Sequence, residues 1–249
     1  GSRSLVVGGV ALYKALEKIR EKACQIGAHL LEAKLEDVVY EGGGVQVRGV
    51  PGKAVGFGQI AALANLGAFN LPETIEPGLE VTTFFSPANF SFPFGTHACA
   101  VEVDPEDGKI EIRRYVCVDD VGVIVNPLLV EGQIHGGVAQ GVSQALYEEL
   151  VYDENGQPLG LGLMDYAVPK AAQVPWFETQ FTVTPATTNP MGVRGVGEAG
   201  TIGSTPAVVN AVVDALSHLG VRDLNMPLTP ERIYQAIQQA KSTKGGARS

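Results

Sequence analysis

A glycine-rich loop that leads into an apolar segment constrains this 249-residue chain most strongly. Glycines recur through residues 192–203, and glycine adopts backbone conformations that a Cβ forbids, so the main chain of such a loop can approach a large ligand closely. One carboxylate, Glu198, lies between these glycines. Ser204 or Thr205 is expected to cap a helix that has Pro206 in its first turn. We interpret the segment as a ligand site rather than a linker.

The same loop contains a G-x-G-x-x-G pattern, formed by Gly195, Gly197 and Gly200, which is typical of dinucleotide binding. The fingerprint requires a strand immediately before it, but residues 184–194 contain two prolines and no apolar run. A carboxylate at Glu198 would also repel a pyrophosphate at the start of a helix. A nucleotide-binding dehydrogenase is therefore the least favoured function.

Composition excludes several classes of partner and compartment. The formal net charge of −9 argues against nucleic acid or an anionic membrane as a partner. No run of 18 apolar residues is present, so no membrane span is expected, and the first residues do not resemble a signal peptide. Three scattered cysteines, Cys24, Cys99 and Cys117, form neither a disulfide framework nor a set of metal ligands, which favours a cytoplasmic location. They are also too few to hold an iron–sulfur cluster.

Periodicity predicts a mixed α/β or α+β fold in one compact domain without a clear linker. Helices are expected at residues 10–31, 57–66, 130–150, 206–219 and 230–240, and strands at residues 38–40, 45–47, 97–103, 110–118, 149–152 and 178–183. A flexible polar tail is expected from residue 242 to residue 249.

The expected helix at residues 130–150 is unusually rich in glycine, at positions 132, 136, 137 and 141. Each glycine costs a helix about 1 kcal/mol relative to alanine, so close packing against backbone or a ligand is expected. Helical spacing places four residues on one face, namely Gln133, Gly137, Gln140 and Gln144. This row of amides either faces a ligand or is an ordinary solvent-facing surface.

Among the ionisable residues, Glu198 is the best catalytic candidate. In a desolvated glycine-lined pocket its charged form would be disfavoured, which would raise its pKa toward that of a useful general base. The alternative is a loop glutamate that points into water. Arg194 could pair with an anionic ligand or with a buried carboxylate, and Asp119 and Asp120 are expected to be solvated or to cap the backbone rather than to bind a cation.

Three motifs together resemble the C-terminal part of the molybdenum-binding large subunit of the xanthine oxidase family, which includes xanthine dehydrogenase, aldehyde oxidoreductases and the aerobic carbon monoxide dehydrogenase large chain. The first is the turn Gly1-Ser2-Arg3-Ser4, which precedes a long helix and resembles a cofactor-contacting turn. The second is the glycine-rich stretch 131–148, and the third is Gly195-Val-Gly-Glu-Ala-Gly200. The resemblance assigns residues 1–241 to the second half of a molybdopterin-binding domain with mixed sheets and packed helices.

The resemblance implies a molybdenum hydroxylase that oxidises a carbon centre of an aldehyde, an N-heterocycle or carbon monoxide with oxygen drawn from water. It implies molybdopterin in its cytosine dinucleotide form, with no protein ligand to the metal. Glu198 would be the base, and Gln140 would hydrogen-bond the cofactor near the metal. The main chain and hydroxyls of Gly1, Ser2 and Ser4 would contact the pterin or its phosphates, and Gly197 of the glutamate loop would also bind the cofactor.

The resemblance also implies partners. Electrons would leave through iron–sulfur and FAD centres on other subunits of an oligomer. The match begins in mid-motif at Gly1, so the N-terminal half of the molybdenum subunit is expected to complete the site for a small-molecule substrate. The alternative is a non-catalytic scaffold or subunit-association domain whose site residues are idle without that half.

Overall fold

The computed structural model describes residues 2–160 and 162–246 of the chain. It divides into two compact units: unit 1 comprises Gly1–Val6 and Ala88–Ser249, and unit 2 comprises Val7–Pro87. Each unit has its own cluster of buried hydrophobic residues. The sequence predicted one compact domain, because no composition typical of a linker marks the boundary between the units.

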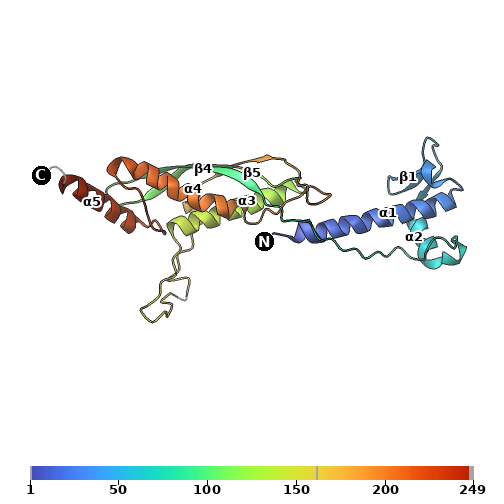
Figure 1. Ribbon diagram of the computed structural model, residues 1–249, viewed down its shortest axis with the longest axis horizontal. Helices are drawn as coiled ribbons and strands as arrows, with labels where there is room; N and C mark the ends of the chain where they lie inside the picture. Colours follow the sequence, from blue (N-terminus) through green and yellow to red (C-terminus); the bar gives the residue numbers. More distant parts are fainter. Residues whose placement is uncertain (1, 161, 247–249) are drawn as a thin grey trace. The chain divides into compact units, whose positions relative to one another are not determined.

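Unit 2 packs two helices against a small antiparallel sheet (Figure 1). Its helices are α1 (Val10–Leu30) and α2 (Phe57–Leu66), its strands are β1 (Val38–Glu41), β2 (Gly44–Val47) and β3 (Ala54–Gly56), and short turns of helix occupy Leu35–Asp37 and Ala68–Asn70. The predicted hairpin is confirmed. Gly42 and Gly43 form its turn with φ values of 60° and 80°, as a two-residue turn between twisted strands requires. The sequence did not predict β3.

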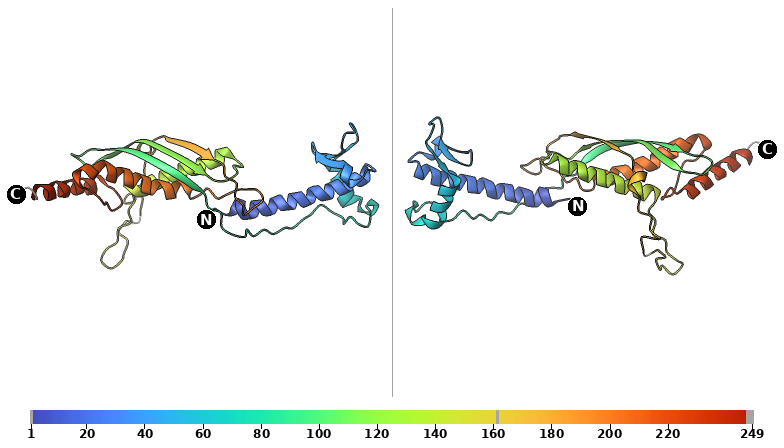
Figure 2. Two further views of the ribbon diagram at one scale, coloured as in Figure 1. Left: turned by 45° about the horizontal axis from the view of Figure 1, so that its top comes forward. Right: turned by 180° about the vertical axis from the view of Figure 1, so that it is seen from behind.

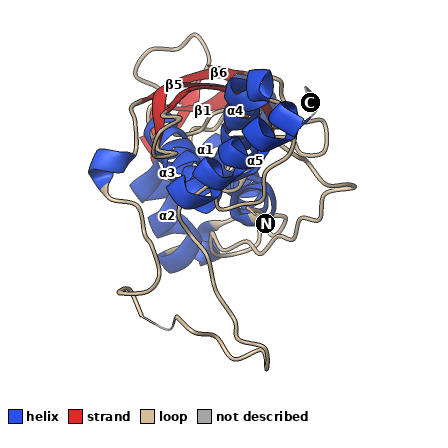
Figure 3. Ribbon diagram, turned by 90° about the vertical axis from the view of Figure 1, so that its left-hand side faces the viewer, coloured by secondary structure: helices blue, strands red, loops and turns tan. Residues whose placement is uncertain are grey.

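Unit 1 is a sheet with helices on one face. Its strands are β4 (Phe94–Val103), β5 (Ile110–Asp120) and β6 (Phe177–Thr182), and its helices are α3 (Pro127–Leu146), α4 (Ala199–Leu216) and α5 (Pro230–Gly246). Two 3-10 turns lie at Ala171–Gln173 and Ser217–Leu219. A π-helical turn, Ser4–Gly9, begins in unit 1 and continues along the chain into unit 2. The strand order is β4-β5-β6, antiparallel between β4 and β5 and parallel between β5 and β6. Helices α3 and α4 run side by side beneath β4 and β5 (Figures 1 and 2). Figure 3 is a view along the helices, in which the sheet is seen from its end.

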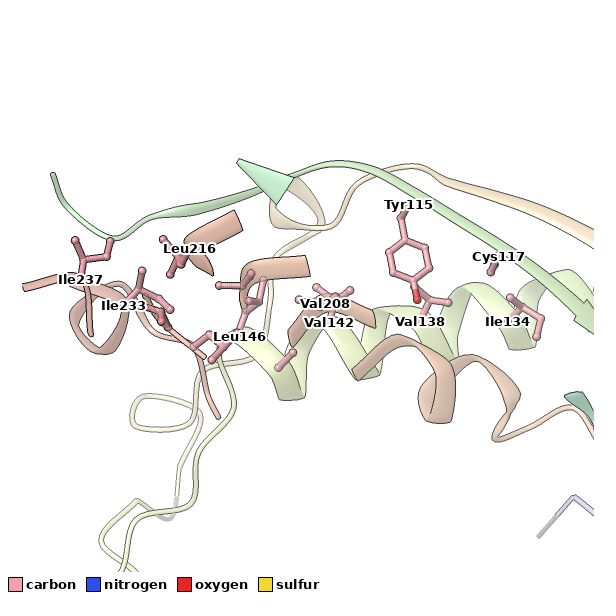
Figure 4. Packing of buried hydrophobic residues seen from close by; sticks show 14 residues of the cluster. Tyr115, Cys117, Ile134, Val138, Val142, Leu146, Val208, Leu216, Ile233 and Ile237 are labelled. Atoms are coloured by element: carbon pink, nitrogen blue, oxygen red, sulfur yellow. The ribbon is translucent and has the colours of Figure 1, made fainter. Parts of the chain in front are cut away.

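The core of unit 1 lies between this sheet and α3 and α4, and extends to α5 (Figure 4). Alternate strand residues face inward, because successive side chains of a strand point to opposite faces. Tyr115 and Cys117 of β5 thereby meet Ile134, Val138 and Val142 of α3, all fully buried. Among the described residues, none of the helices has the combination of length and hydropathy needed to cross a membrane.

Helix α4 begins earlier than the sequence predicted. It starts at Ala199, so Pro206 lies inside the helix and Ser204 is fully buried instead of capping it. Glycine and proline made this stretch resemble a loop, but packing against α3 outweighs their low helix propensity. Helix α3, by contrast, has an ordinary start, because Asn126 accepts a hydrogen bond from the Leu129 N–H at 3.3 Å and Pro127 follows the cap.

Two further expectations differ from the structure. Residues 149–152 do not form a strand, since only an isolated bridge joins Tyr152 to Pro158, and apolar residues at that point are exposed rather than paired. Helix α5 continues to Gly246, beyond the predicted end at residue 240. Residues 242–246 of the predicted tail are therefore helical, and residues 247–249 lie outside the described residues.

Candidate functional site

Glu198 occupies the position directly before the first residue of α4. Its carbonyl accepts the first helical hydrogen bond, from the Ile202 N–H at 3.0 Å, so its side chain lies at the positive end of the helix dipole. The side chain is exposed. The described part of this chain therefore does not by itself bury Glu198, as the desolvated pocket of the sequence interpretation required.

Ser2 meets the glutamate loop, although 195 residues separate the two partners. The Gly197 N–H donates a hydrogen bond of 2.9 Å to Ser2 Oγ. A Cβ on Gly195 would lie 2.5 Å from the carbonyl oxygen of Ser2, so only glycine allows this approach. Ser2 itself has a φ of 52°, a left-handed conformation that is uncommon for a residue other than glycine and that is enriched at functional sites. Two motifs identified separately in the sequence are thus in direct contact.

The glycines of α3 have two different surroundings. A Cβ on Gly137 would lie 2.9 Å from the Thr201 backbone nitrogen, and one on Gly141 would lie 1.8 Å from Ser204 Oγ. These two glycines therefore serve close packing against α4. Gly132 and Gly136 have nothing within 4 Å of a Cβ position, so no contact among the described residues requires them.

The predicted row of amides follows the line where α3 meets α4. Gln133, Gln140 and Gln144 are all exposed. Thr205 Oγ1 donates a hydrogen bond of 3.1 Å to Gln144 Oε1, and Thr201 Oγ1 lies 3.5 Å from Gln140 Oε1. A Cβ on Gly197 would lie 3.6 Å from Gln133 Oε1, so the row extends to the glutamate loop. Its amides are accessible both to solvent and to a ligand over the start of α4.

The predicted site residues are therefore partly brought together. Ser2, Gly197, Glu198 and Gln140 lie around the first turns of α4, on unit 1. Ser4 is exposed at the start of the π-helical turn. Gly1 lies outside the described residues.

The dinucleotide alternative lacks its structural context. The strand that precedes the loop, β6, ends at Thr182, well before Gly195, and β5 is joined to β6 by α3 rather than by this segment. Gly200, the last glycine of the pattern, packs on α3, where a Cβ would lie 2.6 Å from the Ile134 carbonyl oxygen. That glycine serves helix packing instead of a phosphate.

A buried polar network between the sheet and α4 was not foreseen from the sequence. His97 Nδ1 lies 2.7 Å from the Tyr115 hydroxyl, and Nε2 lies 3.4 Å from Asp119 Oδ1. Asp119 is 2% exposed, and its Oδ2 has no hydrogen-bond partner among the described residues. Burial raises the pKa of the neighbouring Cys117 thiol to about 11, and the nearby Asp119 adds to this. The alternation of inward-facing and outward-facing residues along β4 and β5 could have predicted that these side chains point inward. It could not have predicted which of them hydrogen-bond to one another.

Ligand atoms of His97, Cys117 and Asp119 all lie within 4.8 Å of one another, and such a set of nitrogen, sulfur and oxygen donors suits zinc. Both ring nitrogens of His97 already have partners, however. We therefore interpret the cluster as a hydrogen-bonded network.

Arg194 and Asp120 hold the loops that flank the site. Burial alone would raise the pKa of Asp120, but hydrogen bonds from the Gly122 N–H and from Thr182 and Thr184 outweigh it and lower the pKa. Arg194 Nε lies 4.0 Å from Asp120 Oδ1, and its NH1 donates a hydrogen bond of 2.8 Å to a backbone carbonyl oxygen in the loop before β4. Of the two roles considered for Arg194, the geometry supports pairing with a buried carboxylate, and Asp120 caps the backbone as expected.

Residues 1–175 match a family described as the molybdopterin cofactor-binding domain. Over 96% of its length the chain is 40% identical to the carbon monoxide dehydrogenase large chain of Hydrogenophaga pseudoflava, of which it covers 29%. It is 38% identical, also over 96% of its length, to the nicotine 6-hydroxylase large subunit of Paenarthrobacter nicotinovorans, and again covers 29% of that protein. The chain thus spans less than a third of the length of these curated relatives.

Solved structures agree with these sequence relatives. A Cu,Mo-CO dehydrogenase matches with a TM-score of 0.89 and 36% identity, over 96% of this chain and 30% of the other. Quinoline 2-oxidoreductase from Pseudomonas putida 86 matches with a TM-score of 0.83 and 39% identity, over 90% of this chain and 28% of the other. The predicted class of mixed α/β fold with packed helices is confirmed.

Proposed function

Because the chain belongs to the molybdopterin cofactor-binding domain family, we propose that it supplies the C-terminal part of the catalytic site of a molybdenum hydroxylase. The contact between Ser2 and Gly197 carries this proposal. It joins the cofactor-contacting turn to the glutamate loop, with the amide row of α3 alongside. A surface scaffold would not require the strained backbone of Ser2 or the glycines that admit it.

The described residues suit one side of a molybdopterin. Gln140 offers both a hydrogen-bond donor and an acceptor, which matches the mixed edges of a pterin. Ser2 and Ser4 carry hydroxyls on an exposed turn, and such groups bind phosphates and pterin polar atoms. When bound, the cofactor supplies the redox and oxygen-transfer chemistry. We assign it the cytosine dinucleotide form.

Glu198 is assigned the role of general base. Its carboxylate accepts a proton as water-derived oxygen is transferred to the substrate carbon, and the two electrons released leave the subunit. The remaining segments of the molybdenum subunit are proposed to cover Glu198. This burial would remove the carboxylate from bulk water, as expected of a base that acts on a bound substrate.

Partners and substrates follow from the relatives. Iron–sulfur and FAD groups are placed on other subunits, since the three cysteines of this chain, all free thiols, cannot hold a cluster. Free thiols also agree with the proposed cytoplasmic location. The relatives named above act on carbon monoxide, nicotine and quinoline. We therefore propose carbon monoxide, an N-heterocycle or an aldehyde as the substrate class, bound by an oligomeric enzyme.

Molybdenum analysis tests this function most simply. The chain alone holds only part of the cofactor contacts, each worth about 1 kcal/mol, so we expect it to carry little or no molybdenum. Co-expression with the rest of the subunit should restore stoichiometric metal. Stoichiometric molybdopterin in the chain expressed alone would refute the division of the site, and no metal in the complete subunit would favour a non-catalytic scaffold.

Gln140→Ala in the complete subunit tests the cofactor contact. Loss of one hydrogen bond of about 1 kcal/mol should weaken cofactor retention by about fivefold. The matched control is Gln238→Ala, which removes an exposed glutamine from helix α5. Equal molybdenum retention in both variants would contradict the role assigned to Gln140.

A further inference from the structure

The buried imidazole of His97 fills a notch in helix α4. A Cβ on Gly203 would lie 2.7 Å from three atoms of the His97 ring, so glycine at this position is what allows the ring to lie against the helix backbone. The side chain of His97 is only 4% exposed. Hydrogen-bond partners on both sides, Tyr115 and Asp119, hold the ring in one orientation.

Tyr115 contacts Ser204, the residue that follows Gly203 in α4. Its hydroxyl, besides lying 2.7 Å from His97 Nδ1, shares a side-chain hydrogen bond with Ser204. The Tyr115 side chain is fully buried, as is Ser204. Strands β4 and β5 therefore contact α4 at two consecutive residues. The His97 ring packs against Gly203, and Tyr115 shares a hydrogen bond with Ser204.

The same helical turns also pack on α3. Gly137 meets Gly200 and Thr201, and Gly141 meets Ser204, each closer than a Cβ would allow. The first turns of α4 are thus held between the buried network and the backbone of α3. Because a helix is rigid over a few turns, a displacement at Gly203 would carry Glu198 with it.

We propose that His97 is a positioning residue for Glu198, acting by fixing the place and rotation of the first turns of α4. The inference rests on the proposed function, in which Glu198 must meet the reacting atoms. A misplacement of about 1 Å, even far from the chemistry, can lower a rate by about 10²-fold. Neither His97 nor Gly203 has to touch substrate or cofactor for this effect.

A pair of compensating substitutions in the complete enzyme tests the proposal, because one adds a methyl group and the other removes the ring that it meets. The variants are Gly203→Ala, His97→Ala and the double variant. Each is assayed with carbon monoxide, nicotine and quinoline as substrates, in the presence of an artificial electron acceptor. Gly203→Ala should lower kcat per bound molybdenum by about tenfold to 10²-fold, with a smaller change in KM. Adding His97→Ala should restore part of kcat, because it removes the ring that the new methyl group meets. Such non-additivity identifies a direct coupling.

A second readout does not depend on turnover. Hydrogen exchange of the backbone amides from residue 197 to residue 205 should be faster in Gly203→Ala than in the wild type, and partly recover in the double variant. Tyr115→Phe, which keeps the ring and loses the hydroxyl, should give a milder change in the same direction and serves if Gly203→Ala does not load molybdenum. The matched control is Gly58→Ala in α2, where nothing lies within 4 Å of a Cβ.

Two results would overturn the role of His97. One is that the effects of Gly203→Ala and His97→Ala are additive. The other is that both amide exchange and kcat per molybdenum are unchanged in Gly203→Ala and Tyr115→Phe. The proposed function fails differently. If Glu198→Gln keeps full turnover, the assignment of the base is wrong, while the coupling of His97 to the amides of α4 is still measured by exchange.

Discussion

Individual side chains in unit 1 differ sharply in their access to water, and this decides their chemistry. Cys117 on β5 is fully buried, and burial raises the pKa of its thiol to about 11. Cys99 on β4 is partly buried, and burial raises the pKa of its thiol to about 11 as well. Glu198, by contrast, is exposed. At this scale the thiols of Cys99 and Cys117 are held in their less reactive protonated form, whereas the side chain of Glu198 is accessible to water.

We therefore expect the Cys117 thiol to react very slowly with iodoacetamide in the folded protein at pH 8. The thiolate is the reactive form, and a pKa raised by about two units lowers its population by about 100-fold. Raising the pH toward 11 should accelerate labelling as the folded thiol ionises. Mass spectrometry of the Cys117 peptide measures the rate, with the chain unfolded in urea as the reference. Equal rates in the folded and unfolded chain would contradict the burial.

Residues of the candidate site could be proposed from the sequence where they belong to a contiguous motif, and their roles stay predictions. Ser2, Gly197, Glu198 and Gln140 are such residues, and the structure gathers them around α4. The network of His97 was not predictable, because its members come from different strands and only the register of β4 with β5 brings them together. Strand pairing of this kind leaves no local trace in the sequence.

Among the elements, the crossing of α3 and α4 organises unit 1. Their contact is made by small residues, with Gly137 and Gly141 on one helix and Gly200 and Ser204 on the other. Close approach of two backbones requires such residues, since protein interiors leave no room for additional methyl groups. Gly137, Gly141 and Gly200 thus have a structural reason that is independent of any ligand.

Gly200→Ala should destabilise the chain by about 1–3 kcal/mol, the usual cost of overpacking, since the new Cβ would lie 2.6 Å from a carbonyl oxygen of α3. The matched control is Gly136→Ala on α3, where nothing lies within 4 Å. That change should be neutral or stabilise by up to about 1 kcal/mol, because alanine favours the helix. Urea unfolding of both variants measures the difference. A Gly200→Ala variant as stable as Gly136→Ala would contradict the packing described.

Elements with a clear period and ordinary ends were predicted well from the sequence. The helix at residues 57–66 and the hairpin around Gly42 and Gly43 are confirmed. The start of α4 was wrong because glycine and proline normally mark loops, whereas packing on α3 keeps this stretch helical through Pro206. Local propensity is a weak guide where tertiary contacts decide.

At the scale of the whole chain, a large amount of apolar surface is exposed. The described part of the loop 147–176 shows it most clearly, where Leu163, Met164 and Trp176 are 84%, 100% and 91% exposed. Large apolar side chains left exposed on a loop in this way are typical of a surface that another part of the protein covers. The curated relatives are more than three times as long as the matched part, so we expect the rest of the molybdenum subunit to cover this loop.

Limited proteolysis with chymotrypsin tests this expectation. In the chain alone, cleavage should begin within the loop, at residues such as Leu163, Met164 or Trp176, because the loop exposes them outside regular helices and strands. In the complete subunit, cleavage there should be at least about tenfold slower if the loop is covered, since cleavage then requires local opening. Fragment masses give the sites. An equal rate in both would show that the rest of the subunit leaves the loop uncovered.

The division into two units was beyond the reach of composition. Each unit buries its own cluster, one around Ile26 and Val45 and the other around Tyr115 and Val138. Both clusters use the same residue types, and the residues between them carry no charge run or low-complexity tract. The sequence therefore predicted the class of fold correctly but could not predict how many cores it contains.

The central claim, that this chain supplies the base of a molybdenum hydroxylase, is tested most directly by Glu198→Gln in the complete enzyme. The substitution keeps the shape of the side chain and removes the proton acceptor. Turnover per bound molybdenum should fall by about 10²–10⁴-fold, the usual contribution of a general base, while molybdenum content stays at the wild-type level. The control, Glu154→Gln at an exposed loop position, should retain full turnover. Wild-type turnover by Glu198→Gln across the pH range would contradict the claim.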